Sequence, residues 1–226
     1  MGKLFIIPTP VGNLEDITLR ALRILGEVET IFAEDTRVTK KLLDHYNINK
    51  PIMSYHQYNE HHQLSRYIDI IERSTGIALV SDAGTPSISD PGFLIIRECI
   101  KQNIEIECLP GATAFVPALV NSGFPSDKFY FYGFLPHKKG RKTAIEKLIN
   151  ISETIILYES PFRLIKTLEE LKNVCEETRQ VCVCRELTKI YEEIIRGTIT
   201  EVLSYFSAKT VKGEIVIVLQ GSKGII

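Results

Sequence analysis

The chain has 226 residues, of which 44% are hydrophobic and 24% are charged. This balance is typical of a folded globular protein and excludes disordered, collagen-like and coiled-coil classes. The formal net charge of −1 also argues against an extended nucleic-acid-binding surface, which usually carries a strong basic excess, but it leaves room for a local basic patch.

Short apolar runs alternate with amphipathic segments of helical length in the first half of the chain. We expect strands over residues 3–7, 30–33, 51–55, 77–81 and 104–109, and helices over 17–25, 36–46, 60–73 and 92–102. Alternation of this kind predicts βαβ units and a mostly parallel sheet.

The second half has a less regular pattern, which follows a break at residues 123–127. We expect helices over 113–121, 139–149, 162–174 and 199–206, and strands over 129–131, 154–158, 181–184, 192–196 and 214–219. The predicted fold class is therefore α/β, with two domains at residues 1–115 and 116–226.

Five cysteines occur without a C-x-x-C pair, and Cys108, Cys182 and Cys184 lie in expected strands. We expect buried, reduced thiols, with redox or metal roles as the alternatives. The first residues hold only a short apolar tract at 4–7, and no stretch approaches the roughly 18 apolar residues of a membrane span. We therefore expect a soluble, cytoplasmic protein.

The richest loop, residues 81–92, follows the apolar strand at 77–81. In an open α/β sheet, ligands bind beyond the carboxyl ends of the strands. Gly84 permits close approach of the backbone, and Asp82 and Asp90 add acceptors. For Asp90 we instead expect a cap on the next helix, and a tight surface turn is the alternative for the rest of the loop. The candidate ligand-binding residues are Asp82, Ala83, Gly84, Thr85 and Ile88.

Two further loops follow expected strands. In the loop 110–114, Gly111 at a helix start would leave N–H groups free to hold an anion, unless it serves turn geometry alone. The turn 8–16 is neither a G-x-G-x-x-G nor a Walker A loop, which disfavours a classical dinucleotide enzyme; a stiff turn capped by Asp16 or Thr18 is the alternative. Candidate binding residues here are Pro10, Gly12, Pro110, Gly111, Ala112, Thr113 and Ala114.

Glu34 and Asp35 directly follow an expected strand, beside Arg37. Two adjacent carboxylates can transfer protons or orient a hydroxyl group, although Asp35 or Thr36 could equally cap the next helix. The histidines favour solvated surface over a metal site, because the adjacent pair at 61–62 cannot share one helix face. We expect no metal.

In the second half, Glu159 follows a strand, and Glu186 lies between Arg185 and Lys189 after another. A cluster of cations near Tyr130 and Tyr132 fits contacts with RNA phosphates, with an ordinary basic helix start as the alternative. The candidate RNA-binding residues are Arg37, Lys40, Lys138, Lys139, Arg141 and Lys142.

Six segments, in order, resemble the tetrapyrrole methylase superfamily and, within it, the ribosomal RNA small subunit methyltransferase I group. They are IIPTPVGNLEDITLRAL (6–22), AEDTRVTKKLL (33–43), LVSDAGTPSISDPG (79–92), LPGATAFVPALVNSGFP (109–125), YESPFRL (158–164) and CRELTKIYEE (184–193). Pro10 stands where tetrapyrrole-modifying relatives usually have glycine, which fits the ribosomal group.

The resemblance implies a homodimer of two-domain chains that binds S-adenosylmethionine in a cleft between the domains. It further implies methylation of the 2′-hydroxyl of a cytidine in the decoding region of small-subunit ribosomal RNA. The near-neutral net charge with local clusters of cations separately favours the assembled 30S particle as the substrate. Carbonyl groups near 82–85 would face the sulfonium, and N–H groups near 111–113 would hold the methionine carboxylate.

For the chemical step, we expect Glu34, Glu159 or Glu186 as the base and Lys189 or Arg185 as its electrostatic partner. Two other functions remain open: a precorrin-like tetrapyrrole methyltransferase, and a non-catalytic RNA-binding or assembly module.

Overall fold

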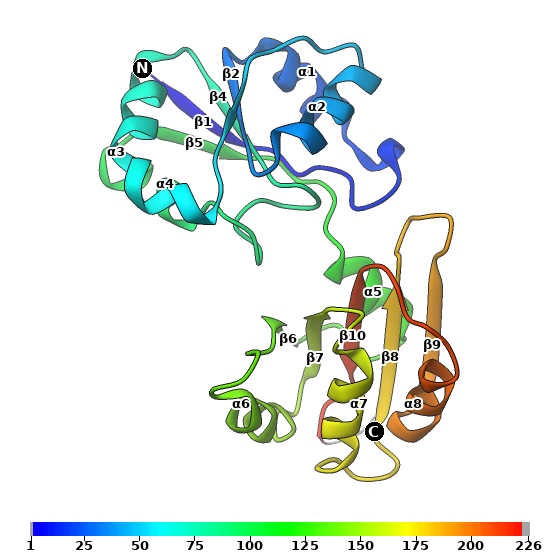
Figure 1. Ribbon diagram of the computed structural model, residues 1–226. Coiled ribbons are helices and arrows are strands. Elements are labelled where there is room, and N and C mark those ends of the chain that lie inside the picture. Colours follow the sequence, from blue (N-terminus) through cyan, green and yellow to red (C-terminus); the bar gives the residue numbers. More distant parts are fainter. Residues whose placement is uncertain (1, 223–226) are drawn as a thin grey trace. The chain divides into compact units, whose positions relative to one another are not determined.

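The computed structural model describes residues 2–222. They form two compact units, which divide between Thr113 and Ala114, two residues before the expected boundary (Figure 1). Within the described residues, no helix is both long enough and apolar enough to cross a membrane.

The first unit is built on a five-stranded sheet in the order β3-β2-β4-β1-β5, in which every pairing is parallel. Its strands are β1 (Lys3–Ile6), β2 (Thr30–Ala33), β3 (Ile52–Ser54), β4 (Ile77–Val80) and β5 (Glu105–Cys108). Its helices are η1 (Leu14–Asp16), α1 (Leu19–Glu27), α2 (Thr36–His45), α3 (Gln57–Arg73) and α4 (Phe93–Lys101). The predicted alternation of strands and helices is confirmed.

Helices cover both faces of this sheet (Figure 1). The apolar sides of α1 and α2 pack on one face, and those of α3 and α4 pack on the other. Strand β4 is consequently buried at all four residues, as its uninterrupted apolar sequence predicts for a strand covered on both sides.

Polar residues fix several helix starts in the first unit. The Thr18 hydroxyl accepts a hydrogen bond from the N–H of Ala21 and begins α1, and the Asp35 carboxylate accepts from the N–H of Arg37 and begins α2. The N-cap residue of α4 is Gly92 and not Asp90, which differs from the predicted helix start.

The second unit has a mixed sheet in the order β6-β7-β10-β8-β9. Only β6 and β7 pair in parallel, and the other three pairings are antiparallel. Its strands are β6 (Phe129–Phe134), β7 (Thr154–Glu159), β8 (Gln180–Arg185), β9 (Glu193–Thr198) and β10 (Ile215–Leu219). Its helices are α5 (Phe115–Ser122), α6 (Arg141–Leu148), α7 (Leu164–Lys172) and α8 (Ile199–Ser207).

Helix α5 packs on one face of this second sheet, and α6, α7 and α8 pack on the other. Strands β7 and β10 therefore carry apolar residues on both faces. Because β7 and β8 each pair antiparallel with β10, their carboxyl ends lie at the same edge, and Glu159 and Arg185 both lie opposite Ile215.

Three of the five cysteines are buried, Cys175 is half-buried and Cys108 is exposed. Cys99 is buried in the first unit, and Cys182 and Cys184 are buried in the second, where their sulfur atoms lie 3.7 Å apart. Cys108 is exposed, which contradicts the expected burial, because it ends β5 at the edge of the first sheet.

Candidate functional site

Three loops meet at the carboxyl edge of the first sheet, where β1 lies between β4 and β5. Thr9 and Gly84 form an isolated antiparallel bridge, with N–H to carbonyl distances of 2.9 Å and 2.8 Å. The hydroxyl of Thr85 donates to the carbonyl oxygen of Ala112 at 3.1 Å. These contacts bring together the three loops that the sequence singles out, which we call the three-loop site.

Gly84 has a left-handed backbone with φ of 80°. A Cβ there would lie 3.6 Å from Cγ1 of Val11 and 3.9 Å from the carbonyl oxygen of Ala112. The position therefore needs glycine for its conformation, and a larger side chain would fill the space between the loops.

Gly111 does not begin a helix, because α5 starts four residues later, at Phe115. The expectation that its N–H group lies at a helix N-terminus is therefore wrong. A Cβ on Gly111 would lie 2.8 Å from Cβ of Pro8. The glycine thus permits close packing against the first loop. The other candidates on these loops include the exposed residues Gly12, Ile88 and Pro110.

Three carboxylates lie beside the three-loop site, where β2 and β4 are neighbours. The N–H of Asp35 donates to Oδ1 of Asp82 at 3.0 Å, and the N–H of Asp82 lies 3.4 Å from Oε2 of Glu34. Burial, reinforced by the charge of Asp82, raises the pKa of Glu34. Burial also raises the pKa of Asp82. Hydrogen bonds from Arg37 instead lower the pKa of Asp35 to about 2.

His56 is a polar residue of this corner that sequence reasoning missed. It follows β3, which pairs with β2 so that Ser54 lies opposite Ala33, the residue before Glu34. Its Nδ1 atom is buried and has no hydrogen-bond partner among the described residues. The charge of His56 partly offsets the rise in the pKa of Glu34. The sequence feature that could have identified His56 is its position just beyond an expected strand, which places it at the same sheet edge as Glu34 and Asp82.

A second group of candidate residues lies in the second unit, beyond the end of β8. Oε1 of Glu186 accepts hydrogen bonds from Nζ of Lys189 and from the N–H of Glu214, both at 2.9 Å. Glu186 has a positive φ of 53°, and a Cβ on Gly213 would collide with its carboxyl group. The backbone around Gly213 therefore fixes the position of this carboxylate.

Opposite charges keep this pair ionised at neutral pH. Burial alone would raise the pKa of Glu186, but the N–H of Glu214 and the ammonium of Lys189 lower it below its ordinary value. Burial alone would lower the pKa of Lys189, but Glu186 and Glu214 raise it. A carboxylate that can accept a proton thus lies beside a permanent cation.

A pocket of about 270 Å³ lies beside this pair, and we call it the Glu186 pocket. It is lined by Arg185, Glu186, Tyr191, Lys209, Thr210, Val211, Lys212 and Gly213. Among the described residues, no group of three or more His, Cys, Asp or Glu side chains could hold a metal ion.

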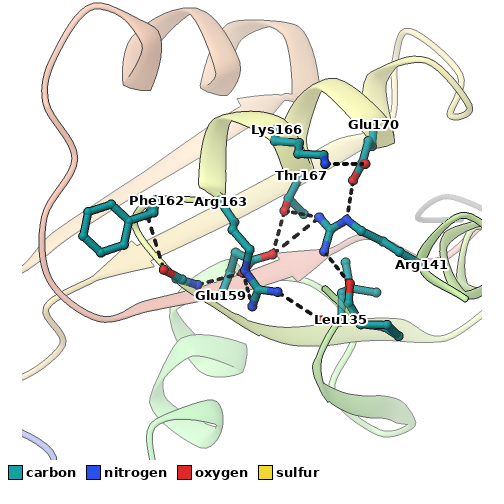
Figure 2. A network of polar contacts seen from close by, with 10 residues as sticks. Leu135, Arg141, Glu159, Phe162, Arg163, Lys166, Thr167 and Glu170 are labelled. Carbon is teal, nitrogen blue, oxygen red and sulfur yellow. Dashed lines mark hydrogen bonds and ion pairs between the residues drawn. The ribbon is translucent and has the colours of Figure 1, made fainter. Parts of the chain in front are cut away.

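Glu159 and Arg141 lie in a buried ion-pair network instead of at a reactive surface (Figure 2). Glu159 is only 2% exposed, and its Oε1 lies 2.7 Å from Nη2 of Arg163. Its Oε2 accepts a 2.6 Å hydrogen bond from the hydroxyl of Thr167. The expectation that Glu159 acts as the base is wrong, because both of its oxygens are occupied inside the core.

Arg141 is only 4% exposed, so it is no part of an exposed RNA-binding patch, contrary to the sequence-based expectation. Its guanidinium contacts Glu170 at 2.7 Å, Thr167 at 2.7 Å and Glu159 at 3.7 Å (Figure 2). The first residue of α6 thereby joins that helix to α7 and β7. The adjacent cations Lys138, Lys139 and Lys142 are exposed, as are Arg37 and Lys40.

The Arg141→Met variant is expected to lower the free energy of unfolding by about 3 kcal/mol, because it breaks a buried ion-pair network. The value lies at the lower end for such changes, since Arg163 still pairs with Glu159. Lys142→Met is the matched control and should stay within about 0.5 kcal/mol of the parent, because Lys142 is exposed. Denaturant titration measures both values, and equal stabilities would contradict the structural role of Arg141.

Comparison with known proteins gives the family. The model of the tetrapyrrole (corrin/porphyrin) methylases matches residues 3–203. A ribosomal RNA small subunit methyltransferase I from Thermotoga maritima is 43% identical over 99% of this chain and 100% of its own length. Its counterpart from Hydrogenobaculum is 48% identical over 96% of this chain and 95% of its own. The chain belongs to the ribosomal RNA small subunit methyltransferase I family of tetrapyrrole methylases.

Solved structures share this fold at low sequence identity. A diphthine synthase matches with a TM-score of 0.75 and 12% identity, over 96% of this chain and 90% of its own. A uroporphyrin-III C-methyltransferase from Thermus thermophilus, complexed with S-adenosylhomocysteine, matches with a TM-score of 0.68 and 17% identity, over 97% of each chain. The predicted tetrapyrrole methylase fold is confirmed.

Proposed function

We propose that this protein transfers a methyl group from S-adenosylmethionine to the 2′-hydroxyl of a cytidine in the decoding region of small-subunit ribosomal RNA. The observation that carries the proposal is the match of 43–48% identity, over nearly the whole chain, to proteins named ribosomal RNA small subunit methyltransferase I. The tetrapyrrole methyltransferases are structural relatives at below 20% identity, which supports only a common fold.

The three-loop site fits S-adenosylmethionine. Gly84 leaves open the space that a side chain would fill, and Asp82 supplies acceptors beside it. Backbone groups at 82–85 and 111–113 would hold the sulfonium and the carboxylate of the cofactor, with Pro10 and Gly12 on the first loop. When bound, the cofactor supplies an electrophilic methyl group.

In the chemical step, we assign proton transfer to Glu186. The carboxylate of Glu186 would take the proton of the 2′-hydroxyl as the 2′-oxygen bonds to the methyl group that a bound cofactor would supply, with S-adenosylhomocysteine as the leaving group. Lys189, 2.9 Å from that carboxylate, stabilises negative charge on the attacking oxygen, and Arg185 contributes to the same field. Glu34 lies beside Asp82 at the three-loop site. There it would contact the bound cofactor, or it would take the hydroxyl proton in place of Glu186.

The RNA contacts that we propose are local. Lys138, Lys139 and Lys142 form one exposed cationic patch near the start of α6. Arg37 and Lys40 form another on α2, where they pair with Asp35 and Asp44. Because the total charge is nearly balanced, such patches fit recognition of a preformed particle better than binding along extended RNA. We therefore propose the assembled 30S particle as the substrate and a homodimer as the active form.

A filter assay with methyl-labelled S-adenosylmethionine tests the proposal. Purified 30S subunits that lack the modification should acquire label, and nuclease digestion should release it as 2′-O-methylcytidine. Free ribosomal RNA, as a second substrate, tests the requirement for the assembled particle. Label transferred only to a precorrin-like acceptor, or binding to 30S subunits without transfer, would overturn the proposed function.

A further inference from the structure

We propose that the Glu186 pocket binds a single unstacked nucleoside of the RNA substrate, with Tyr191 stacking on its base and Lys212 contacting an adjacent phosphate. This inference rests on the proposed function, because it assumes an RNA substrate. It adds a recognition site for one nucleotide beside the residues assigned to the chemical step.

The size and lining of the pocket fit one nucleoside. Its volume of about 270 Å³ lies just below the roughly 300–1,000 Å³ of pockets that enclose drug-sized ligands, so it cannot admit a helical segment. Its lining combines an aromatic ring and an aliphatic side chain, Tyr191 and Val211, with three cations and one carboxylate. Proteins that recognise RNA by sequence use this combination, stacking splayed-out bases on aromatic rings.

The cations on one side of the pocket are held in place before any ligand binds. Glu193 accepts hydrogen bonds from Nε of Arg185 and from Lys209, and Arg185 also donates to the carbonyl oxygens of Tyr191 and Lys212. Burial alone would raise the pKa of Glu193, but its bonds to Lys209, Tyr205 and Arg185 lower it to about 2. Glu193 therefore stays ionised near neutral pH and holds Arg185 and Lys209 in place.

The rim of the pocket presents apolar surface to the outside. Ile190 is 95% exposed and Tyr191 is 72% exposed, side by side on the segment after β8. The same segment holds Glu186 and Thr188 at positive φ, and the N–H of Thr188 donates to Glu192 at 2.6 Å. Strained backbone of this kind clusters at functional sites. An exposed ring beside a carboxylate–ammonium pair is thus presented for stacking.

The charges at the pocket favour an anionic ligand. Lys212 is exposed at the rim, while Arg185 and Lys209 share Glu193. A phosphate next to a bound nucleoside would meet Lys212 and the field of the other cations, while the carboxylate of Glu186 would face the ribose hydroxyl. This arrangement fits a ribonucleotide better than an acidic peptide, which offers no flat ring for Tyr191.

The test compares Tyr191→Ala and Tyr191→Phe in the labelled-cofactor assay. Loss of one base stack should raise KM for 30S subunits about 5- to 150-fold in Tyr191→Ala, while the affinity for S-adenosylmethionine and the thermal stability stay unchanged. Tyr191→Phe should retain the parental KM. The control is Ile100→Ala, since Ile100 is exposed in the last turn of α4, in the other unit.

A second readout addresses the phosphate contact. Lys212→Gln should lower the slope of log affinity for 30S subunits against log salt concentration by about 0.7–0.9, the contribution of one phosphate contact. Lys172→Gln, at the exposed end of α7, should leave the slope unchanged.

The outcomes separate the two proposals. If the parent protein methylates 30S subunits and Tyr191→Ala has the parental KM, the nucleoside site is wrong and the proposed function stands. A change of oligomeric state in Tyr191→Ala, seen by sedimentation, would assign this rim to contacts between copies and would also overturn the inference. No methylation of 30S subunits by the parent protein would overturn the proposed function itself.

Discussion

The Glu186→Gln variant is expected to lower the rate of methyl transfer to 30S subunits about 10²- to 10⁴-fold, the usual contribution of a positioned general base. The amide keeps the shape of the side chain and can still accept hydrogen bonds from Lys189 and the N–H of Glu214, but it cannot take a proton at neutral pH. Single-turnover kinetics with saturating S-adenosylmethionine measure the rate, and calorimetry should show unchanged cofactor affinity.

The pH dependence gives an independent check on the same assignment. Because the pKa of Glu186 lies below its ordinary value, activity should fall only at acid pH, as the carboxylate becomes protonated. Lys189→Met removes one group that lowers this pKa, so it should move the acid limb to higher pH. An acid limb that stays in place would separate Glu186 from the chemical step.

Glu214→Gln is the matched control, and Glu34→Gln tests the alternative base. Glu214 also lies within 3.2 Å of Lys189, but it is largely exposed and holds Glu186 through its backbone, so its variant should retain most activity. Full turnover by Glu186→Gln with intact cofactor affinity would remove Glu186 as the base. A loss confined to Glu34→Gln would assign that role to Glu34.

The Gly84→Val variant is expected to abolish detectable binding of S-adenosylmethionine. A β-branched residue at φ of 80° is strongly disfavoured, and its methyl groups would enter the space bordered by Val11 and Ala112. Gly84→Ala should weaken binding less, because its Cβ makes only ordinary contacts. Calorimetric titration with the cofactor measures both affinities, and an unchanged affinity in Gly84→Val would contradict the assignment.

Gly123→Val separates backbone strain from filling of the site. Gly123 ends α5 with φ of 72°, and a Cβ there would meet no described heavy atom within 4 Å. Valine at position 123 has a backbone strain comparable to that of valine at position 84, but it lies outside the three-loop site. The Gly123→Val variant should therefore lose stability but keep cofactor affinity, whereas Gly84→Val should lose affinity even under conditions where circular dichroism shows that it is folded.

The strands were predictable because their signals are local. The apolar run at 77–81 and the observed β4 (Ile77–Val80) differ by one residue, as expected for a strand buried on both faces. The pairing of the second sheet was not predictable in this way. Whether β8 and β10 run antiparallel depends on the path of the chain between them, and apolar runs alone do not encode that path.

The candidate sites also include some that the sequence could predict and some that it could not. The three loops were found because each follows a strand, and parallel strands bring such loops to one edge. Arg141 and Glu159 were misjudged because their burial depends on Thr167 and Glu170, which come from α7. In the sequence, a charged residue that begins a helix looks the same whether its partner is solvent or a neighbouring helix.

Gly111 shows that a contact between distant parts of the chain also escapes prediction from the sequence. Its glycine is required by a contact with Pro8, about a hundred positions earlier in the chain, and no local turn signal carries that information. His56 was missed because a single histidine after a short strand has no spacing pattern. Its relation to Glu34 appears only once β2 and β3 are paired.

The distribution of the cysteines makes the unfolding of each unit separately measurable. Cys99 is enclosed in the first unit, where burial raises its pKa to about 12, and Cys182 and Cys184 are enclosed in the second. A buried thiol reacts with an alkylating reagent only when the core around it opens. The labelling rate of Cys99 thus reports opening of the first unit, and that of the other two reports opening of the second, while exposed Cys108 provides an internal standard in the folded protein.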